Sequence, residues 1–480
     1  MPSGTSALKN MSGISSKFPV INLEDCLGCG NCYTSCPDTA VYSTVVHQKD
    51  LETAYKTANL NETQIAEVSK AFAKITESKG AKKYVAAAEK ANLDPEQYFV
   101  TYLFDYNACK GCGECAEICN PKAISMTEKN ANVKEYAELL MKVFRELPRI
   151  NQAFTGNDVM LDSVNYTKTS GHGACMGCGE ATAIRMFSTA TYKEYGQFMI
   201  VASTGCSSVF SSAYPYNSFT VPWHTPLFEN APTTAMGVRA GLDSRGDADK
   251  KIWVTMGDGA AYDIGFQALS RLLSSGLNVN VLVLDTGAYS NTGGQTSTAS
   301  FKGADAKMSA HGKKIHGKQE MRKNLINIVM EHPDTFAAQV SAGYKTHFIK
   351  AIQDANSFEG PSFVLAYTPC MPEHGIGDNQ GFNRARAAVQ SRAHPLVTYD
   401  PRKGNRAYER ISLDGNPDVN EDWATVKGEL FTFLEFAKKE GRFQKHFAGE
   451  QPTDTILASR DEVLRQWNNL QEKARIDLKK

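Results

Sequence analysis

The twelve cysteines of this chain fall into three groups of four, and their spacing constrains its fold and chemistry more than any other feature. Two groups share the pattern C-x-x-C-x-x-C-x-x-x-C, and the third is scattered. Four thiolates are the ligand set of a cubane iron–sulfur cluster. The cysteines therefore predict three 4Fe-4S clusters in a protein that transfers single electrons. The groups are Cys26, Cys29, Cys32 and Cys36; Cys109, Cys112, Cys115 and Cys119; and Cys175, Cys178, Cys206 and Cys370.

Length and charge narrow the class of protein. At 480 residues the chain is long enough for two or three domains. Lys+Arg and Asp+Glu balance at 52 each, so no net field attracts nucleic acid or an anionic membrane. No apolar run approaches the ~20 residues that span a bilayer, and the N-terminus has no signal-peptide core. We therefore expect a cytoplasmic protein with reduced cysteines and with no nucleic-acid or membrane partner.

The two regular cysteine runs form one unit that is repeated. Each run follows an apolar strand candidate and precedes another, which is the pattern of a two-cluster ferredoxin. The 72 residues between Cys36 and Cys109 carry apolar side chains at helical spacing, which predicts a helical insertion between the two halves. We place an N-terminal arm that lies on a partner at residues 1–20, and an α+β two-cluster ferredoxin-like domain at residues 21–150.

The spacing within the runs predicts which cysteines share a cluster. In the bacterial two-cluster pattern, the fourth cysteine of each run ligates the other cluster. Gly28, Gly30, Gly111 and Gly113 allow the tight loops that this arrangement requires. A pair of zinc sites is the alternative, which the spacing disfavours. One predicted cluster is held by Cys26, Cys29, Cys32 and Cys119, and the other by Cys109, Cys112, Cys115 and Cys36.

The second half of the chain alternates short apolar strands with helices. FMIVAST, KIWVTMGD, NVNVLVLDT and PSFVLAYT are typical of strands buried on both faces, as in a parallel sheet. YDIGFQALSRLLSSG and TFAAQVSAGYKTHFIKAIQDANS supply the crossover helices. This pattern predicts a doubly wound α/β domain over residues 151–400. We expect a helical extension at residues 401–480, with amphipathic helices near 421–440 and 458–478.

Two strand ends predict a site for a diphosphate and Mg²⁺. Gly257-Asp258-Gly259 lies at a strand-to-helix turn, where backbone N–H groups favour phosphate and Asp258 offers a hard oxygen. Thr286, 28 residues after Asp258, ends the next strand, and neighbouring parallel strands bring their ends together. The pairing resembles the thiamine-diphosphate fingerprint, although its usual Asn-Asn is here Ser290-Asn291.

The scattered cysteines lie near the same strand ends. Cys206 and Cys370 each follow a predicted strand, so the fold can bring them to Cys175 and Cys178. Taken singly, each is better explained as a small buried side chain. Taken with the two regular runs, they predict a third cluster next to the thiamine. Two histidines lie near these motifs, and we interpret His172 as a hydrogen-bonded structural residue and His224 as an ordinary loop residue.

Together these motifs resemble the pyruvate:ferredoxin oxidoreductases, within the 2-oxoacid:ferredoxin oxidoreductase family. The resemblance covers residues 18–400 and includes SGHGACMGCGE, TGCSS, GDGAAYDIG, DTGAYSNTGGQ and YTPC. It implies that Glu180 and Asn291 act in catalysis, and that Asp258, Thr286 and the Ala288 carbonyl bind Mg²⁺. It also implies that the scattered cysteines hold the cluster nearest the thiamine. The implied thiamine diphosphate contacts are Glu180, Cys206, Gly257, Asp258, Gly259, Ala260, Thr286, Gly287, Ala288, Tyr289, Ser290 and Asn291.

The resemblance implies reversible oxidative decarboxylation of pyruvate with coenzyme A, with electrons passing through three clusters to ferredoxin or flavodoxin. The family also has a thiamine domain on the pyrimidine side and coenzyme A-binding domains. The chain begins at its ferredoxin module and contains neither, so we expect one subunit of a split enzyme that assembles as a dimer of heteromers. Two alternatives stay open: another 2-oxoacid (2-oxoglutarate, oxalate or a branched 2-oxoacid), and a non-catalytic electron-transfer subunit.

Overall fold

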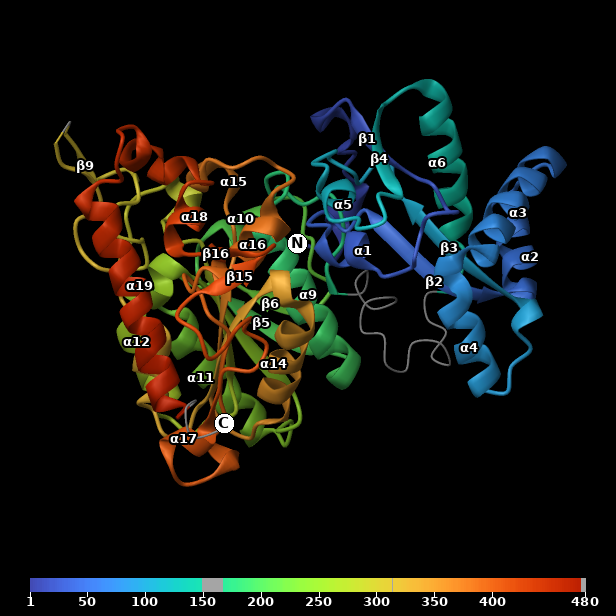
Figure 1. The fold of residues 1–480 in the computed structure, drawn as a ribbon. Helices are drawn as coiled ribbons and strands as arrows, with labels where there is room; N and C mark the ends of the chain where they lie inside the picture. Colours follow the sequence, from blue (N-terminus) through green and yellow to red (C-terminus); the bar gives the residue numbers. More distant parts are fainter. Residues whose placement is uncertain (149–166, 313, 476–480) are drawn as a thin grey trace. The chain divides into compact units, whose positions relative to one another are not determined.

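The computed structural model describes residues 1–148, 167–312 and 314–475. The chain divides into two compact units, Met1–His172 with Tyr214–Thr220, and Gly173–Ala213 with Val221–Lys480 (Figure 1). The domain boundary predicted at 150/151 lies outside the described residues, as does the end of the predicted extension, residues 476–480. Within the described ranges, no helix combines the length and apolar character needed to cross a bilayer.

The first unit is built from two antiparallel strand pairs. β1 (Lys17–Ile21) pairs with β4 (Ile124–Glu128), and β2 (Val41–His47) pairs with β3 (Tyr98–Phe104). Each cysteine run passes through a short helix, and these helices are α1 (Asn31–Ser35) and α5 (Glu114–Glu117). The strands predicted on either side of each cysteine run are therefore confirmed, and the repeat produces two similar halves.

The helical insertion between the halves is also confirmed. It consists of α2 (Gln48–Thr57), α3 (Glu62–Glu77) and α4 (Lys82–Lys90). A capping box between Asn61 and Gln64 fixes the start of α3. The apolar faces of these helices pack with β2, β3 and α6 (Ala131–Phe144) in one buried core that includes Leu51, Val68, Phe72, Leu103 and Val143.

The N-terminal arm is hydrogen-bonded to its own chain, and the predicted contact of residues 1–20 with a partner stays a prediction. The backbone N–H of Gly4 donates to Phe219 O at 3.0 Å, and the Ser6 hydroxyl donates to Ser170 O at 2.6 Å. Strand β1 already begins within the predicted arm.

The second unit is organised around a mixed sheet of eight strands in which six neighbouring strands are parallel. The two strands at one edge are antiparallel, and the four strands predicted from the sequence, β5, β7, β8 and β12, all lie in the parallel part. In sheet order the strands are β14 (Ile411–Ser412), β13 (Val397–Tyr399), β11 (Phe336–Ser341), β12 (Ser362–Tyr367), β8 (Asn280–Asp285), β7 (Lys251–Gly257), β5 (Phe198–Ala202) and β6 (Trp223–His224).

Helices cover both faces of this sheet, which confirms the doubly wound α/β fold (Figure 1). One face carries α9 (Gly179–Tyr195) and α14 (Lys345–Ser357). The other carries α11 (Ala231–Ser244), α12 (Phe266–Leu273) and α13 (Leu325–Met330). The long helix α19 (Asp454–Lys473) buries Trp467 and Leu470 in the core on this second face, and the helix predicted near 458–478 is confirmed.

Two predicted helices are wrong in part. The first half of TFAAQVSAGYKTHFIKAIQDANS is strand β11, and only the second half is helix α14. Residues 421–440 form a hairpin of β15 (Ala424–Val426) and β16 (Glu429–Phe431) before the short helix α18 (Phe433–Ala437). Lys427 and Gly428 both have positive φ angles, 53° and 85°, which is the geometry of a tight hairpin turn.

Candidate functional site

Three oxygen atoms predicted to bind Mg²⁺ meet at the ends of β7 and β8. The two strands are parallel and pair Gly257 with Leu284, so Asp258 and Thr286 leave the sheet side by side. The Thr286 hydroxyl lies 3.0 Å from Asp258 Oδ1 and 3.0 Å from the Ala288 carbonyl oxygen. A carboxylate, a hydroxyl and a carbonyl are hard ligands of the kind that Mg²⁺ prefers, so these residues fit the ion.

Further hydrogen bonds hold these ligands in place. The Ser297 hydroxyl donates to Asp258 Oδ2 at 2.6 Å, and the Ser290 hydroxyl donates to Thr286 Oγ1 at 2.8 Å. Burial raises the pKa of Asp258 to about 7, and the nearby Asp285 carboxylate contributes, while the bonds from Ser297 and Thr286 oppose the rise. A divalent cation at this position would reverse the effect, because it favours the ionised carboxylate.

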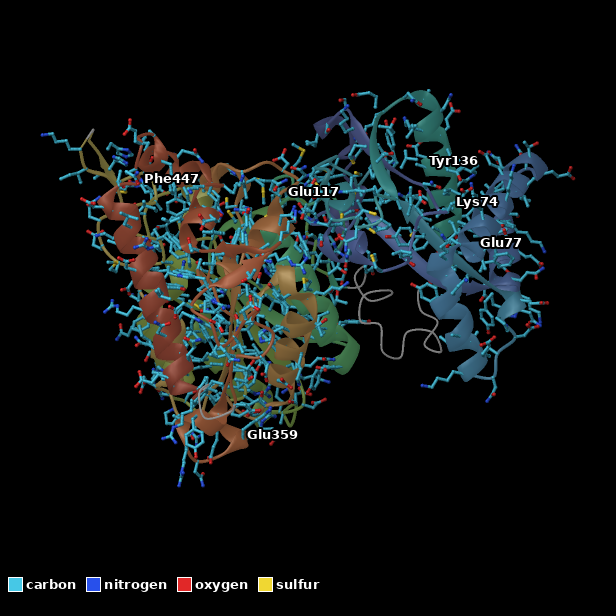
Figure 2. All side chains as sticks on the ribbon, in the orientation of Figure 1. Lys74, Glu77, Glu117, Tyr136, Glu359 and Phe447 are labelled. Carbon is cyan, nitrogen blue, oxygen red and sulfur yellow. The ribbon has the colours of Figure 1, made fainter. Side chains whose placement is uncertain are left out.

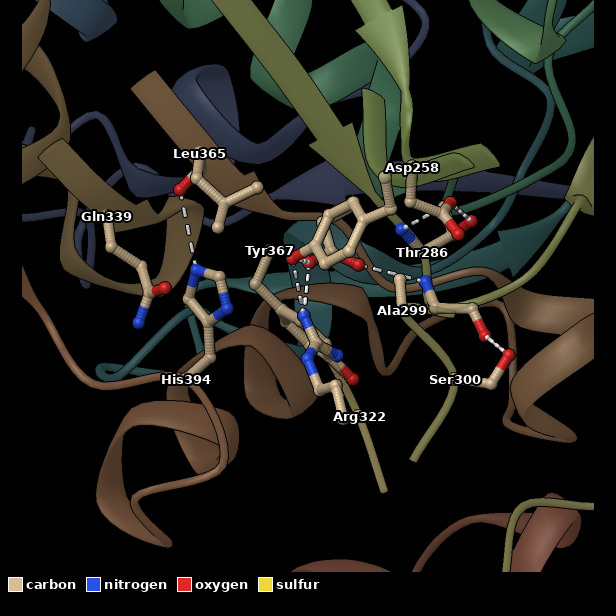
Figure 3. A network of polar contacts seen from close by, with 12 residues as sticks. Asp258, Thr286, Ala299, Ser300, Arg322, Gln339, Leu365, Tyr367 and His394 are labelled. Atoms are coloured by element: carbon tan, nitrogen blue, oxygen red, sulfur yellow. Dashed lines mark hydrogen bonds and ion pairs between the residues drawn. The ribbon is translucent and has the colours of Figure 1, made fainter. Parts of the chain in front are cut away.

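A buried ion pair between Asp285 and Arg322 holds the start of the loop that follows β8. Asp285 accepts hydrogen bonds from the Gly287 backbone N–H at 3.0 Å, from the Tyr262 hydroxyl at 2.8 Å and from Arg322. The Ser300 hydroxyl donates to Gly287 O at 2.6 Å, so both backbone polar groups of Gly287 are engaged. Figure 3 shows Asp258 and Thr286 on one side of this network and Arg322 on the other.

A cleft opens at these strand ends. It is lined by all but one of the residues predicted to contact thiamine diphosphate, and Gly287 is the exception. Thr204, Gly205, Phe228 and Thr292 also line it. The predicted residues in the lining are Glu180, Cys206, Gly257, Asp258, Gly259, Ala260, Thr286, Ala288, Tyr289, Ser290 and Asn291.

Glu180 lies in the first turn of α9, and its side chain reaches the cleft. Only 5% of the residue is exposed. Burial raises the pKa of its carboxyl to about 8, the Asp258 carboxylate adds to the rise, and the backbone N–H of Ser207 opposes it. A buried acid therefore lines the same cleft as the residues predicted to bind Mg²⁺.

The scattered cysteines meet at the same end of the sheet. Cys178 precedes α9, Cys206 opens α10 (Cys206–Ser211), and Cys370 precedes α15 (Met371–His374). Helix N-termini stabilise thiolates, the form that binds iron. Burial raises the pKa of the Cys206 thiol, and Glu180, Cys178, Cys370 and Cys175 raise it further, which indicates that the four thiols lie near one another. Cys206 also lines the cleft.

The first unit brings Cys36 together with three cysteines of the second run. These four residues, Cys36, Cys109, Cys112 and Cys115, line one cavity. Burial and the neighbouring Cys36 raise the pKa of the Cys109 thiol to about 12. This is the grouping predicted for one of the two ferredoxin-type clusters.

Three of the four cysteines in the other predicted group lie near one another, and these are Cys26, Cys29 and Cys32. Burial raises the pKa of Cys32 to about 12; the hydrogen bond from Tyr102 opposes the rise, and Cys29 and Cys26 add to it. The fourth member, Cys119, is buried near the end of its run, and its place beside the other three stays a prediction. Glu117, labelled in Figure 2, ends α5 two residues before it.

None of the twelve cysteines, all of which lie in the described residues, forms a disulfide. In the part of the chain that the structure describes, no three His, Cys, Asp or Glu side chains gather around one point closely enough for a single metal ion. Four cysteines instead line one cavity, and these are Cys36, Cys109, Cys112 and Cys115. Gly28 and Gly111, predicted to allow the tight cysteine loops, both have positive φ angles, 60° and 75°. A Cβ at Gly28 would lie 2.3 Å from Gly80 O, so the loop also needs glycine for close backbone packing.

Comparison with known proteins agrees with both units. The family model described as "4Fe-4S dicluster domain" matches residues 25–123. The model described as "Thiamine pyrophosphate enzyme, C-terminal TPP binding domain" matches residues 203–366. The pyruvate synthase subunit PorB of Thermotoga maritima is 31% identical over 310 residues, which cover 63% of this chain and 90% of PorB. The chain belongs to the pyruvate:ferredoxin oxidoreductase family.

Longer members of the pyruvate:ferredoxin oxidoreductase family match both units in one alignment. The pyruvate:ferredoxin oxidoreductase of Moorella thermoacetica is 27% identical over 494 residues, which cover 86% of this chain and 39% of that protein. The pyruvate-flavodoxin oxidoreductase of Trichormus variabilis is 27% identical over 505 residues, with the same coverage of 86% and 39%. The chain thus spans about two fifths of the length of these relatives.

Some residues of this pyruvate:ferredoxin oxidoreductase family member were missed by sequence reasoning. Three residues outside the sequence motifs hold the ends of β7 and β8 and the loop after β8 through hydrogen bonds. They are Ser297, Ser300 and Arg322, which donate to Asp258, Gly287 and Asp285. Thr204 and Gly205 are the first two residues of the TGCSS motif, so its position between a strand and a helix was a usable signal.

The structure also shows the surroundings of the two histidines that lie near the motifs. His172 is buried, and its Nε2 lies 3.0 Å from Pro37 O, which agrees with the structural role expected for it. His224 is exposed on the edge strand β6 and is absent from the residues that line the cleft.

Proposed function

We propose that this chain is the thiamine diphosphate- and cluster-binding subunit of a pyruvate:ferredoxin oxidoreductase. It would catalyse the oxidative decarboxylation of pyruvate with coenzyme A, and pass the electrons to ferredoxin or flavodoxin. The observation that carries this proposal is that Cys206 belongs to both sites. It lines the cleft that contains Asp258 and Thr286, and it lies near the other three scattered cysteines. An electron released in the cleft would therefore have an acceptor site next to it.

The cofactor would be held by the ends of β7 and β8. Asp258, the Thr286 hydroxyl and the Ala288 carbonyl would bind Mg²⁺, and the backbone from Gly257 to Ala260 would face the diphosphate. The hydrogen bonds from Ser297 and Ser290 orient the oxygen ligands before the ion binds, which lowers the entropic cost of binding. When bound, thiamine diphosphate supplies the electron sink that cleavage next to a 2-oxo group requires.

Other residues of the cleft would orient the reactants. Asn291 is exposed and lines the cleft, where its amide can hydrogen-bond a 2-oxoacid. Glu180 reaches the cleft from α9 and offers a polar contact on the cofactor side. Tyr289 lies over Gly259, and its hydroxyl donates to Asp263 at 3.1 Å, so the ring closes one wall of the cleft.

The cysteines would form a path for single electrons. Cys175, Cys178, Cys206 and Cys370 would hold the proximal cluster, and the eight cysteines of the first unit would hold two more. The match to a dicluster domain over residues 25–123 supports the last two. Three clusters with four irons each give about 12 Fe per chain.

The active enzyme would be an assembly. PorB of Thermotoga maritima is named as a subunit, and this chain aligns with 90% of it. We propose that partner subunits supply the pyrimidine side of the thiamine site and the coenzyme A site, that the complex is a dimer of heteromers, and that it works in the cytoplasm. Pyruvate is the favoured substrate because the aligned relatives are named for it.

The test is to purify the native complex anaerobically and to measure iron, thiamine diphosphate and 2-oxoacid-dependent reduction of ferredoxin. We expect about 12 Fe per copy of this chain and the fastest turnover with pyruvate and coenzyme A. Absence of thiamine diphosphate from an active electron-transfer complex would favour a non-catalytic subunit. Faster turnover with 2-oxoglutarate, oxalate or a branched 2-oxoacid would change the substrate and keep the chemistry.

A further inference from the structure

His374 joins the thiamine side of the site to the cluster side. It ends α15, four residues after Cys370. Its Nε2 lies 2.7 Å from the main-chain oxygen of Thr286, and its Nδ1 lies 3.4 Å from the backbone nitrogen of Cys370. A carbonyl oxygen can only accept and a backbone N–H can only donate, so Nε2 carries the proton and Nδ1 is bare. The two ring nitrogens of one imidazole thus bind one residue of each proposed site.

The surroundings of His374 hold the ring in this orientation. The residue is completely buried. Its ring stacks on Tyr367, with ring centroids 6.1 Å apart and an angle of 29° between the planes. Glu440 Oε1 lies 4.0 Å from Nδ1, and that carboxylate is itself paired with Arg442 at 2.7 Å. Rotation of the imidazole would break both hydrogen bonds in a place that water does not reach, so the bridge is rigid.

We propose that His374 is a positioning residue that fixes the Thr286 loop and the Cys370 main chain at one separation. The inference rests on the proposed function, because Thr286 is a proposed magnesium ligand and Cys370 a proposed cluster ligand. The bond to Thr286 O holds the residue whose hydroxyl faces Asp258. The bond from Cys370 N–H keeps that amide away from the cysteine sulfur. Through these bonds His374 influences both cofactor affinity and the reduction potential of the proximal cluster.

Two conservative substitutions separate the two bonds. In His374→Asn, the side-chain amide occupies the position of Nδ1, so the bond from Cys370 N–H is kept and the bond to Thr286 O is lost. In His374→Gln, the longer amide reaches the position of Nε2, so the bond to Thr286 O is kept and the bond at Cys370 is lost. A general loss of packing cannot produce opposite defects in these two variants.

The experiment measures thiamine diphosphate binding in the presence of Mg²⁺, and the midpoint potential of each cluster by redox titration followed by electron paramagnetic resonance. For His374→Asn we expect thiamine diphosphate to bind about tenfold more weakly, as the loss of one buried hydrogen bond implies, with unchanged cluster potentials. For His374→Gln we expect unchanged binding and a higher potential for the proximal cluster alone. The freed Cys370 N–H can then donate toward sulfur, and such donors tune cluster potentials.

His394→Asn is the matched control. His394 is equally buried in the same unit, its ring lies 5.5 Å from Tyr367, and its Nε2 contacts Leu365 O (Figure 3). It touches neither Thr286 nor Cys370, so this variant should keep both properties. If both His374 variants behave like this control, or if both lose the same property, the positioning role is overturned. If the unaltered protein has no proximal cluster signal, the proposed function fails, and this inference fails with it.

Discussion

The ring of Tyr289 lies directly against Gly259. A Cβ atom at position 259 would be 2.1 Å from the nearest ring carbon of Tyr289, far inside any real contact. The second glycine of the Gly-Asp-Gly turn is therefore required by packing within the protein. Its neighbour Gly257 differs, because a Cβ there would meet nothing within 4 Å.

Gly259→Ala should therefore destabilise the cofactor-free protein, while Gly257→Ala should not. We expect a loss of about 1–3 kcal/mol for Gly259→Ala, because Tyr289 must leave its position or the backbone must shift. Thermal unfolding of the chain without thiamine diphosphate measures the difference. Equal melting temperatures for the two variants would contradict the packing argument.

Asp258→Asn should abolish retention of thiamine diphosphate and leave the ferredoxin-type clusters intact. The amide keeps the size of the side chain but removes the negative charge that binds Mg²⁺. The check is to measure thiamine diphosphate and iron in the purified protein. Asp354→Asn, on the partly exposed face of α14, is the control and should retain both. Normal thiamine content in Asp258→Asn would show that this carboxylate is not a magnesium ligand.

Cys36→Ser and Cys112→Ser should damage the same cluster, although the two residues lie in different runs. The cavity lined by Cys36, Cys109, Cys112 and Cys115 supports this expectation. Electron paramagnetic resonance of each reduced variant should show loss or alteration of one common signal. Cys29→Ser should alter a different signal. A defect in Cys36→Ser that matches Cys29→Ser instead would mean that each run holds its own cluster.

Acid should destabilise the second unit through histidines that burial keeps neutral, and His347 and His394 are two of them. Burial lowers the pKa of His347 and of His394 to about 4, so the folded state binds fewer protons than the unfolded state between pH ~6.5 and ~4. The stabilisation is complete above pH ~6.5 and is lost as the pH falls through this window, by at most about 1.4 kcal/mol per pH unit for each histidine.

Chemical denaturation at several pH values measures this slope. His347→Gln, which removes one of the titrating histidines, should make the dependence on pH shallower between pH ~6.5 and ~4. A slope identical to that of the unaltered protein would be incompatible with a contribution from His347.

Local patterns in the sequence were sufficient for most of the fold. The strands that end at Gly257 and Asp285 are apolar on both faces, and the turns that follow them carry recognisable ligands. Strand β11 was missed because its alanines and glutamine suit a helix equally well, and the break at Ser341 was not recognised as the start of a new element. The hairpin at Lys427-Gly428 was also missed, because its turn is only two residues long and gives little indication in the sequence.

The site was predictable only where its residues belong to compact motifs. Asp258 and Thr286 follow adjacent strands, so sheet topology alone places them together. His374 contacts Thr286 across 88 residues of sequence, and Arg322 reaches Asp285 across 37. No periodicity or spacing signals such contacts, because they depend on how loops of different length return to the sheet.

The grouping of Cys36 with Cys109, Cys112 and Cys115 also dictates an order of maturation. Because its proposed ligands come from both halves of the first unit, that cluster could be inserted only after the ribosome has completed the second run. The proximal set extends to Cys370, so its cluster would be the last to gain a full set of ligands. A chain that ends between residues 123 and 370 would contain the complete ferredoxin module. It would lack Cys370, and therefore the full set of ligands for the cluster next to the catalytic cleft. Such a fragment could accept and store electrons that it has no means of producing.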